Sequence, residues 1–161
     1  MRTKIKHSIL PYSVAIAIPL TIGILSALLT KNNMMIYGEI LKPLLAPPAW
    51  LFPIIWTLLY VLMGISSCIV YLNRDINRDN ARSGLMYYAM SLVANFGWSI
   101  LFFNLRIFGI SFLWLLLLIY LIIRTVVYYL SINRIAAYIQ IPYIIWVAFA
   151  GYLNLAIYIL N

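Results

Sequence analysis

Five long apolar segments, separated by shorter polar ones, make up most of this chain. They cover residues 8–30, 49–72, 83–103, 109–130 and 136–160. Each is at least as long as the ~20 residues that a helix needs to cross the hydrocarbon core of a bilayer. Backbone groups in lipid must be hydrogen-bonded within the protein, and these runs lack the alternation of membrane β-strands. The pattern predicts an all-α polytopic membrane protein, a five-transmembrane-helix bundle, with residues 1–161 in a single membrane domain.

The composition supports this prediction. Of the 161 residues, 66% are hydrophobic and only 9% are charged, whereas a soluble domain is about 25% charged. The net charge of +8 would suit a nucleic-acid partner. The basic residues, however, lie mostly in the short stretches that flank the apolar segments, as topology signals of a membrane protein do. Membrane lipid, not nucleic acid, is therefore the expected surrounding of this chain.

The distribution of the basic residues predicts an orientation. Seven lie on one side of the predicted bundle, namely Arg2, Lys4, Lys6, Arg74, Arg78, Arg82 and Arg134, and three on the other, namely Lys31, Lys42 and Arg106. The positive-inside rule then predicts a cytoplasmic N-terminus and an outside C-terminus. Arg124 lies in the inward-going end of the fourth segment, where its long side chain is expected to reach the interface.

The first connection, residues 31–48, differs from the others in length and in its prolines. Pro43, Pro47 and Pro48 precede Trp50 and the second segment. Proline fixes φ and biases the residue before it towards an extended conformation, so this stretch should be ordered and non-helical. An ordered, aromatic connection at the mouth of a bundle suits a lid over a flat apolar ligand.

The residue types that most catalytic sites require are absent from the predicted spans. The three acidic residues, Glu39, Asp75 and Asp79, all lie in connections, and the single histidine is His7. The sequence therefore offers no Ser/His/Asp set and no metal-ligand cluster. Proton relays within membranes ordinarily use acids or histidines in the spans. These absences argue against hydrolysis, metal chemistry and proton-coupled transport.

The spans do contain aromatic side chains with a few amides. Asn95 lies three residues before Trp98, so both fall on one helix face. On the last span one stripe follows spacings of three and four, through Tyr143, Trp146, Ala150, Leu153 and Asn154. Such residues can line a cavity, with the small Ala150 leaving a slot for something flat. They can equally be interface anchors, core packing or hydrogen-bonding contacts between helices.

Three segments together carry a resemblance to a known family. They are Lys42-Pro43 with Pro47-Pro48, Trp50, Trp56 and Tyr60; Asn95-Phe96-Gly97-Trp98 with Phe102-Phe103; and Pro142-Tyr143 with Trp146, Phe149-Ala150 and Leu153-Asn154. In these residues and spacings the chain resembles the TspO/translocator protein family, the tryptophan-rich sensory proteins of bacteria. The resemblance covers the whole chain.

The resemblance implies a receptor or translocator in a bacterial cell membrane. Its ligands would be porphyrin or haem-type tetrapyrroles, together with synthetic isoquinoline carboxamides or benzodiazepines, in a bundle pocket capped by the first connection. No cofactor is required besides the tetrapyrrole as ligand. The implied ligand-binding residues are Ala27, Thr30, Tyr37, Trp50, Phe52, Trp56, Tyr60, Asn95, Trp98, Tyr143, Trp146, Ala150 and Leu153.

Two other functions remain open at this point. Relatives are linked to oxidative, light-dependent breakdown of protoporphyrin IX. An enzyme of that kind would here work through tryptophan radicals, with Trp56 and Trp146 as the catalytic candidates. A structural protein whose aromatic residues only pack helices is the third hypothesis, and it predicts no saturable ligand site.

The resemblance also bears on partners. Some relatives form homodimers through small residues spaced by four on the third helix, where this chain has Met86 and Met90, with Ser91 and Ala94 nearby. A homodimer is therefore expected, without a defined interface. The family's C-terminal cholesterol motif, Leu/Val, Tyr and Lys/Arg, is incomplete because no basic residue follows Tyr152.

Overall fold

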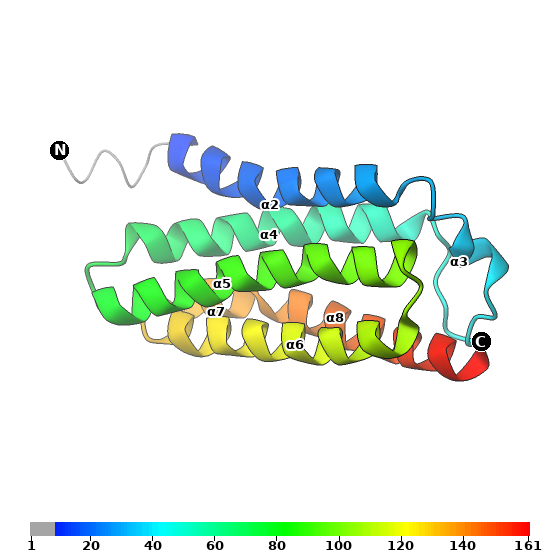
Figure 1. Ribbon diagram of the computed structural model, residues 1–161. Helices are drawn as coiled ribbons and strands as arrows, with labels where there is room; N and C mark the ends of the chain where they lie inside the picture. The colour runs from blue at the N-terminus through cyan, green and yellow to red at the C-terminus, as the bar shows by residue number, and fades with distance from the viewer. Residues whose placement is uncertain (1–8) are drawn as a thin grey trace.

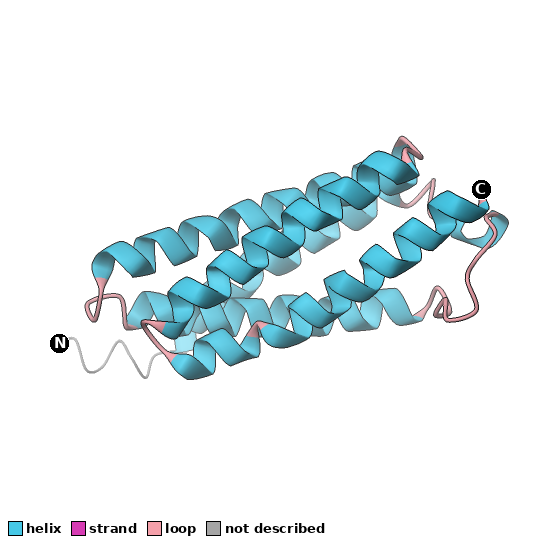
Figure 2. Ribbon diagram, turned by 90° about the horizontal axis from the view of Figure 1, so that it is seen from below, coloured by secondary structure: helices cyan, strands magenta, loops and turns pink. Residues whose placement is uncertain are grey.

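The computed structural model describes residues 9–161, which fold into a bundle of long helices without a strand among them (Figures 1 and 2). The elements are α2 (Ile9–Thr30), α3 (Ile36–Glu39), α4 (Leu51–Leu72), α5 (Arg78–Ser99), the π-helix η1 (Ile100–Asn104), α6 (Phe108–Leu130), α7 (Arg134–Ile139) and α8 (Ile141–Leu160). Within the described residues five spans are long and apolar enough to cross a membrane, with η1 extending α5 and α7 leading into α8. The predicted all-α, five-span class is confirmed.

The predicted spans and the observed helices differ mainly at their starts. The third helix begins at Arg78 instead of residue 83, because the side chain of Asn77 caps it by accepting a hydrogen bond from the Asn80 N–H at 3.1 Å. Asn133 caps α7 in the same way, through the Ala136 N–H at 3.1 Å. The predicted start of the first span at residue 8 lies outside the described residues, as do His7 and the basic residues Arg2, Lys4 and Lys6.

The helices pack mainly as neighbouring pairs, α2 against α4, α5 against α6 and α6 against α8. The most deeply buried side chains lie between these pairs and include Met63, Val70, Leu118, Ile122 and Val147. Helix α4 makes more contact with the short α7 than with α8. It therefore diverges from α8 towards the α3 end of the bundle, and this divergence makes room for a cavity.

Helix α2 runs unbroken through Pro19. Proline cannot donate a hydrogen bond to the carbonyl four residues earlier, here that of Ala15. This carbonyl faces α4 at Gly64, where an added Cβ would lie 2.7 Å from the Ala15 oxygen and 2.5 Å from the Ile16 Cα. The two backbones thus meet directly, because Gly64 has no side chain to separate them.

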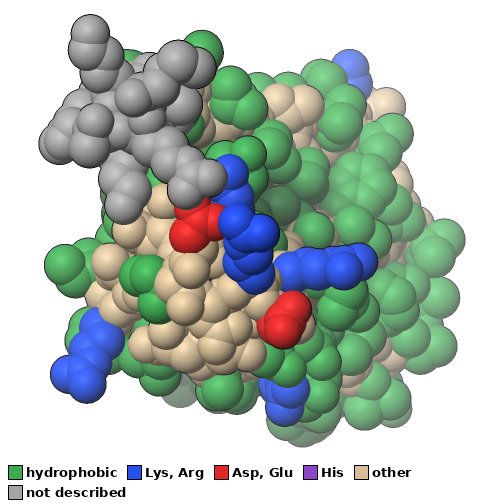
Figure 3. Space-filling view, turned by 90° about the vertical axis from the view of Figure 1, so that its left-hand side faces the viewer, with side chains coloured by type: hydrophobic (Ala, Val, Ile, Leu, Met, Phe, Trp, Pro, Cys, Tyr) green, Lys and Arg blue, Asp and Glu red, His purple; other side chains and the backbone are tan. Residues whose placement is uncertain are grey.

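Basic residues lie at both ends of the bundle. The end that Figure 3 views, at the left of Figure 1, holds the α4–α5 and α6–α7 connections with Arg74, Arg78, Arg82 and Arg134. The opposite end, with α3, holds Lys31, Lys42 and Arg106. Among the described residues the basic side chains thus number four against three, and the rest of the predicted asymmetry depends on Arg2, Lys4 and Lys6 outside them.

A Gly64→Ala substitution tests the direct contact of α2 with α4. We expect it to destabilise the fold by about 1–3 kcal/mol, as overpacking of a close interface does. Thermal unfolding in detergent, followed by circular dichroism, measures the change. Gly151→Ala on α8 is the matched control, because nothing lies within 4 Å of a Cβ added there, and it should be neutral or stabilising. Equal midpoints for the two variants would show that the contact is not needed.

A candidate ligand cavity beneath the first connection

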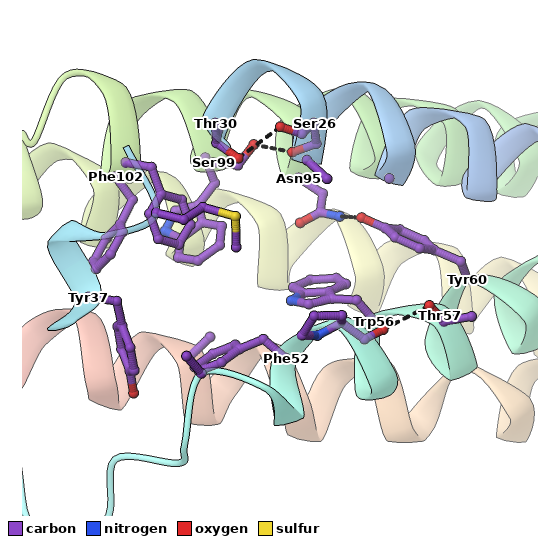
Figure 4. A pocket seen from close by; sticks show the side chains of 18 of the residues that line it. Ser26, Thr30, Tyr37, Phe52, Trp56, Thr57, Tyr60, Asn95, Ser99 and Phe102 are labelled. Atoms are coloured by element: carbon purple, nitrogen blue, oxygen red, sulfur yellow. Dashed lines mark hydrogen bonds between the residues drawn. The ribbon is translucent and has the colours of Figure 1, made fainter. Parts of the chain in front are cut away.

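A cavity of about 310 Å³ lies between α2, α4, α5, η1 and α8 at the α3 end of the bundle (Figure 4). Its volume is near the lower end of the range typical of small-molecule sites. The side chains around it are mostly apolar. They are Leu20, Gly23, Ile24, Ser26, Ala27, Thr30, Met34, Tyr37, Ala49, Phe52, Pro53, Trp56, Thr57, Tyr60, Asn95, Trp98, Ser99, Phe102, Phe103, Ala150, Leu153, Asn154 and Ile157.

Aromatic rings form two opposed walls of the cavity. Phe52 and Trp56 project from α4 on one side (Figure 4). On the other side Trp98 of α5 lies 5.4 Å from Phe102 of η1, measured between ring centroids. The π-helical turn η1 turns Phe102 inward, where it is buried. Such wide turns often occur at functional sites, and the two walls present flat apolar faces to whatever lies between them.

A few polar groups interrupt these walls, and each is anchored. The Asn95 amide N–H donates to the Tyr60 hydroxyl at 2.9 Å, which leaves its amide oxygen pointing into the cavity (Figure 4). The Trp98 indole N–H donates to the Asn154 amide oxygen at 3.1 Å, and the Asn154 amide N–H donates to the Phe108 carbonyl at 2.7 Å. Asn154 therefore joins helices, whereas Asn95 keeps an acceptor free to meet a ligand.

Two serines close the wall between α2 and α5. The hydroxyls of Ser26 and Ser99 form a short hydrogen bond (Figure 4). One turn further along α2, the Thr30 hydroxyl donates to the Ser26 carbonyl at 2.9 Å. The Ser26–Ser99 hydrogen bond matters because only Pro19 and Thr30 of α2 are buried. Helix α2 therefore has few other fixed contacts on the side that faces α5.

The first connection lies over the mouth of the cavity and is held through Tyr37 and Leu41. The Tyr37 hydroxyl donates to the Pro47 carbonyl at 2.9 Å, and its ring meets Phe52 edge-on at 5.2 Å. The Asn161 side chain accepts from the Leu41 N–H at 3.0 Å and donates to the Leu41 carbonyl at 3.1 Å. These contacts fix the connection across the mouth of the cavity.

Partial burial raises the pKa of the Tyr37 hydroxyl above its ordinary value. The hydroxyl therefore stays protonated at neutral pH and keeps donating to Pro47. It would lose this hydrogen bond only as the pH rises through the raised pKa, in strongly alkaline solution.

A second, more open hollow lies under the same connection, with a volume of about 630 Å³. Met34, Tyr37 and Ala49 line both spaces, so Tyr37 stands between them. The ammonium nitrogen of Lys42, which also lines the hollow, lies 5.0 Å from the centre of the Tyr37 ring. A cation is thus held next to the mouth of the cavity.

Ten of the thirteen residues predicted to bind ligand line the cavity. They are Ala27, Thr30, Tyr37, Phe52, Trp56, Tyr60, Asn95, Trp98, Ala150 and Leu153. The other three lie elsewhere. Trp50 is 65% exposed at the start of α4, Tyr143 is buried with its ring 6.2 Å from that of Trp56, and Trp146 lies behind Phe52 at 5.8 Å.

The sequence prediction missed several lining residues, notably Ser26, Ser99 and Phe102. Ser26 lies four positions before Thr30, so helical spacing from that predicted residue could have found it. Ser99 carries no comparable signal, because a small hydroxyl residue in a span also suits plain helix packing.

The cavity can bind but is poorly equipped for acid–base chemistry. None of the described residues that line it carries a carboxylate, an imidazole or an ammonium group. No group of three or more His, Cys, Asp or Glu side chains comes together within residues 9–161. What the cavity offers a ligand is aromatic contact area and a small number of oriented polar atoms.

Comparison with known proteins is consistent with this architecture. The model of the TspO/MBR family matches residues 15–160. The tryptophan-rich protein TspO of Chlorobaculum tepidum is 32% identical over 159 residues, 95% of this chain and 97% of that protein. TspO of Archaeoglobus fulgidus is 35% identical over 155 residues, which cover 96% of this chain and 99% of that protein. The translocator protein of Ovis aries is 34% identical over 118 residues, which cover 73% of this chain and 70% of that protein.

An Asn161→Ala substitution tests how the first connection is held. Loss of both hydrogen bonds to Leu41 should free the connection, because the exposed loop has few other fixed contacts near that point. Hydrogen–deuterium exchange of the backbone over residues 36–48 should become faster, with exchange in α4 and α6 unchanged. Asn80→Ala, which removes an exposed hydrogen bond to Ser131 at the opposite end, should leave residues 36–48 as they are. Unchanged exchange in Asn161→Ala would show that other contacts hold the connection.

Proposed function

This chain belongs to the TspO/MBR family of integral membrane proteins, and we propose that it is a receptor or translocator for porphyrin or haem-type tetrapyrroles and similar flat hydrophobic ligands. The observation that carries the proposal is the partly open cavity with opposed aromatic walls under an ordered connection. Opening and closing of that connection would admit and release the ligand.

The chemistry of the walls suits a planar apolar molecule. Aromatic rings give large contact areas and prefer offset or edge-on contact with other rings. The free amide oxygen of Asn95 could accept a hydrogen bond from a pyrrole N–H, and this would fix the orientation of the macrocycle. Apolar contact would then provide most of the affinity, and Asn95 part of the selectivity.

A tetrapyrrole would need more room than the cavity alone. We propose that such a ligand extends past Tyr37 into the hollow under the first connection, since the two spaces share three lining residues. This requires the Tyr37–Pro47 hydrogen bond to break or shift. Lys42 would then lie near the carboxylate groups that porphyrins carry at their edge.

The alternative is an enzyme that degrades protoporphyrin IX in the light, with molecular oxygen as the oxidant. The favouring observation is that Trp56 lines the cavity and also contacts Tyr60 and Tyr143, at 5.5 and 6.2 Å between ring centroids. A connected group of oxidisable rings is what radical chemistry would use. Trp146, the other candidate, lies outside the cavity, so Trp56 is the residue to test first.

The orientation, membrane and partners of the chain are part of the same proposal. Basic residues at the end with Arg74 and Arg134 favour a cytoplasmic N-terminus in a cell membrane. A homodimer through α5 could use Met86 and Met90, which are 52% and 46% exposed. Ser91 and Ala94 are buried within the bundle, so they are not free to form the small-residue contact seen in some relatives.

Titration with protoporphyrin IX in the dark, followed by tryptophan quenching, tests the binding proposal. We expect saturable quenching, and an unchanged porphyrin spectrum after illumination marks a receptor or carrier. A new absorbing product that disappears in Trp56→Phe but persists in Trp50→Phe would instead support the enzyme. Trp50→Phe is the matched control because Trp50 lies outside the cavity. Absence of saturable binding would contradict both and favour a purely structural role.

Filling the cavity is an independent test. Ala150→Leu places a larger side chain in the slot between the aromatic walls, and it should weaken porphyrin binding at least about tenfold by steric exclusion. Ala89→Leu adds the same atoms at an exposed position on α5 and should bind like the unmodified protein. Thermal unfolding of both variants checks that they fold. Full affinity in a folded Ala150→Leu variant would place the ligand elsewhere.

A further inference from the structure

Arg124 lies within the fourth span, far from the cavity. It precedes the end of α6 by six residues, which is ~9 Å at 1.5 Å per residue. If the 23 residues of α6 are centred in a hydrocarbon core of ~30 Å, its Cα lies only ~8 Å from the midplane. An arginine whose Cα lies at that depth is costly unless its side chain extends towards the interface and finds partners there, and such residues usually have a specific role.

Two tyrosines from neighbouring helices hold the guanidinium group in place. One terminal N–H donates to the Tyr128 hydroxyl at 2.9 Å. The central guanidinium carbon lies 5.2 Å from the Tyr128 ring centre and 5.3 Å from that of Tyr87. These two rings stack at 5.5 Å with an angle of 16° between their planes. Since Tyr128 is one turn closer to the end of α6, the side chain is directed towards the basic end of the bundle.

No carboxylate of the described chain pairs with this cation. Glu39 lies in α3 at the opposite end, Asp75 pairs with Arg78 at 3.1 Å, and Asp79 lies in the first turn of α5. The Nε of Arg124 is itself buried without an acceptor. An anion from outside the chain could therefore pair with this guanidinium through its terminal nitrogens, since the buried Nε is out of reach.

The surroundings of Arg124 indicate which anion could reach it. Its neighbours Ile123 and Val127 are 45% and 53% exposed, and Tyr120, one turn before it on α6, is 50% exposed. In a membrane this apolar surface faces acyl chains, not water. The open side of the site is therefore accessible to a molecule that combines an acyl chain with a negative headgroup.

We propose that Arg124, Tyr87 and Tyr128 form a binding site for the phosphate group of a membrane phospholipid in the leaflet at the basic end of the bundle. A guanidinium group forms strong charge-assisted hydrogen bonds with phosphate oxygens. Four arginines, Arg74, Arg78, Arg82 and Arg134, lie at the same end among Asp75 and Asp79 (Figure 3), with Arg78 paired to Asp75. The remaining cations there would favour anionic lipid near this site. None of the three residues lines the ligand cavity, so the site is independent of the proposed function.

Native mass spectrometry of the detergent-purified protein, titrated with phosphatidylglycerol, tests the proposal. We expect saturable binding that becomes at least about tenfold weaker in Arg124→Gln, because the fixed charge and its donors are lost. Arg134→Gln is the control, since Arg134 is an exposed cation at the same end without this aromatic contact, and it should bind as before. Diacylglycerol with the same acyl chains lacks the phosphate and should not compete.

Three results would overturn the assignment. One is equal phosphatidylglycerol binding by Arg124→Gln and the unmodified protein, and another is equal competition by diacylglycerol. The third is saturation of the site by inorganic phosphate alone, which would make it a site for a soluble anion. If Arg124→Gln fails to fold, Tyr128→Phe keeps the charge and the stacked ring but removes the hydrogen bond. It should weaken binding severalfold, and unchanged binding by a folded Tyr128→Phe variant would equally contradict the site.

Discussion

The side-chain amide of Asn154 joins three helices around the cavity, and the rest of the site depends on it. Its oxygen accepts from Trp98 on α5, while its N–H donates to the carbonyl of Phe108 at the start of α6. In lipid the hydrophobic effect does not drive helices together, so hydrogen bonds and close packing set their positions. With Asn154 only 1% exposed, both ends of the amide are used, and the Trp98 indole is held in one orientation as a cavity wall.

The α2 side of the cavity is built by a different kind of contact. Helix α2 buries little of its own surface and meets α4 through backbone contact at Gly64. Nearer the cavity, the Ser26–Ser99 hydrogen bond ties it to α5. The cavity thus lies between the core of α5, α6 and α8 and the packed pair of α2 and α4, in which α2 buries little of its own surface. An ordered connection, held by Tyr37 and Asn161, covers the open end.

The two ends of the bundle therefore differ in how closely the helices pack. At the α3 end the helices diverge and leave space lined by aromatic rings. At the other end they pack closely, as at Gly84, where an added Cβ would lie 2.9 Å from the Tyr129 ring. The basic residues and the Arg124 site lie towards this closed end. If the first connection opens to admit a ligand, the proposed lipid site at the other end would help to keep the bundle at a constant depth in the membrane.

The sequence by itself determined the class and the membrane character of the protein. Each apolar run is long enough for a helix to cross the hydrocarbon core of a bilayer, and a helix satisfies its own backbone hydrogen bonds there. The family resemblance of the sequence also pointed to ten of the cavity residues, whereas helical spacing alone placed Asn95 with Trp98, and Ala150 with Leu153, on shared helix faces. The sequence placed the start of the third helix too late, because a charged stretch resembles a loop until Asn77 is seen to cap it. Only the tertiary structure decided that Tyr143 and Trp146 lie outside the cavity, although they share a helical stripe with Ala150. It alone also decided which distant residues form hydrogen bonds, namely Asn33 with Asn104 and Leu41 with Asn161. These outcomes depend on where α4 diverges from α8 and on contacts between distant parts of the chain, for which local spacing carries no signal.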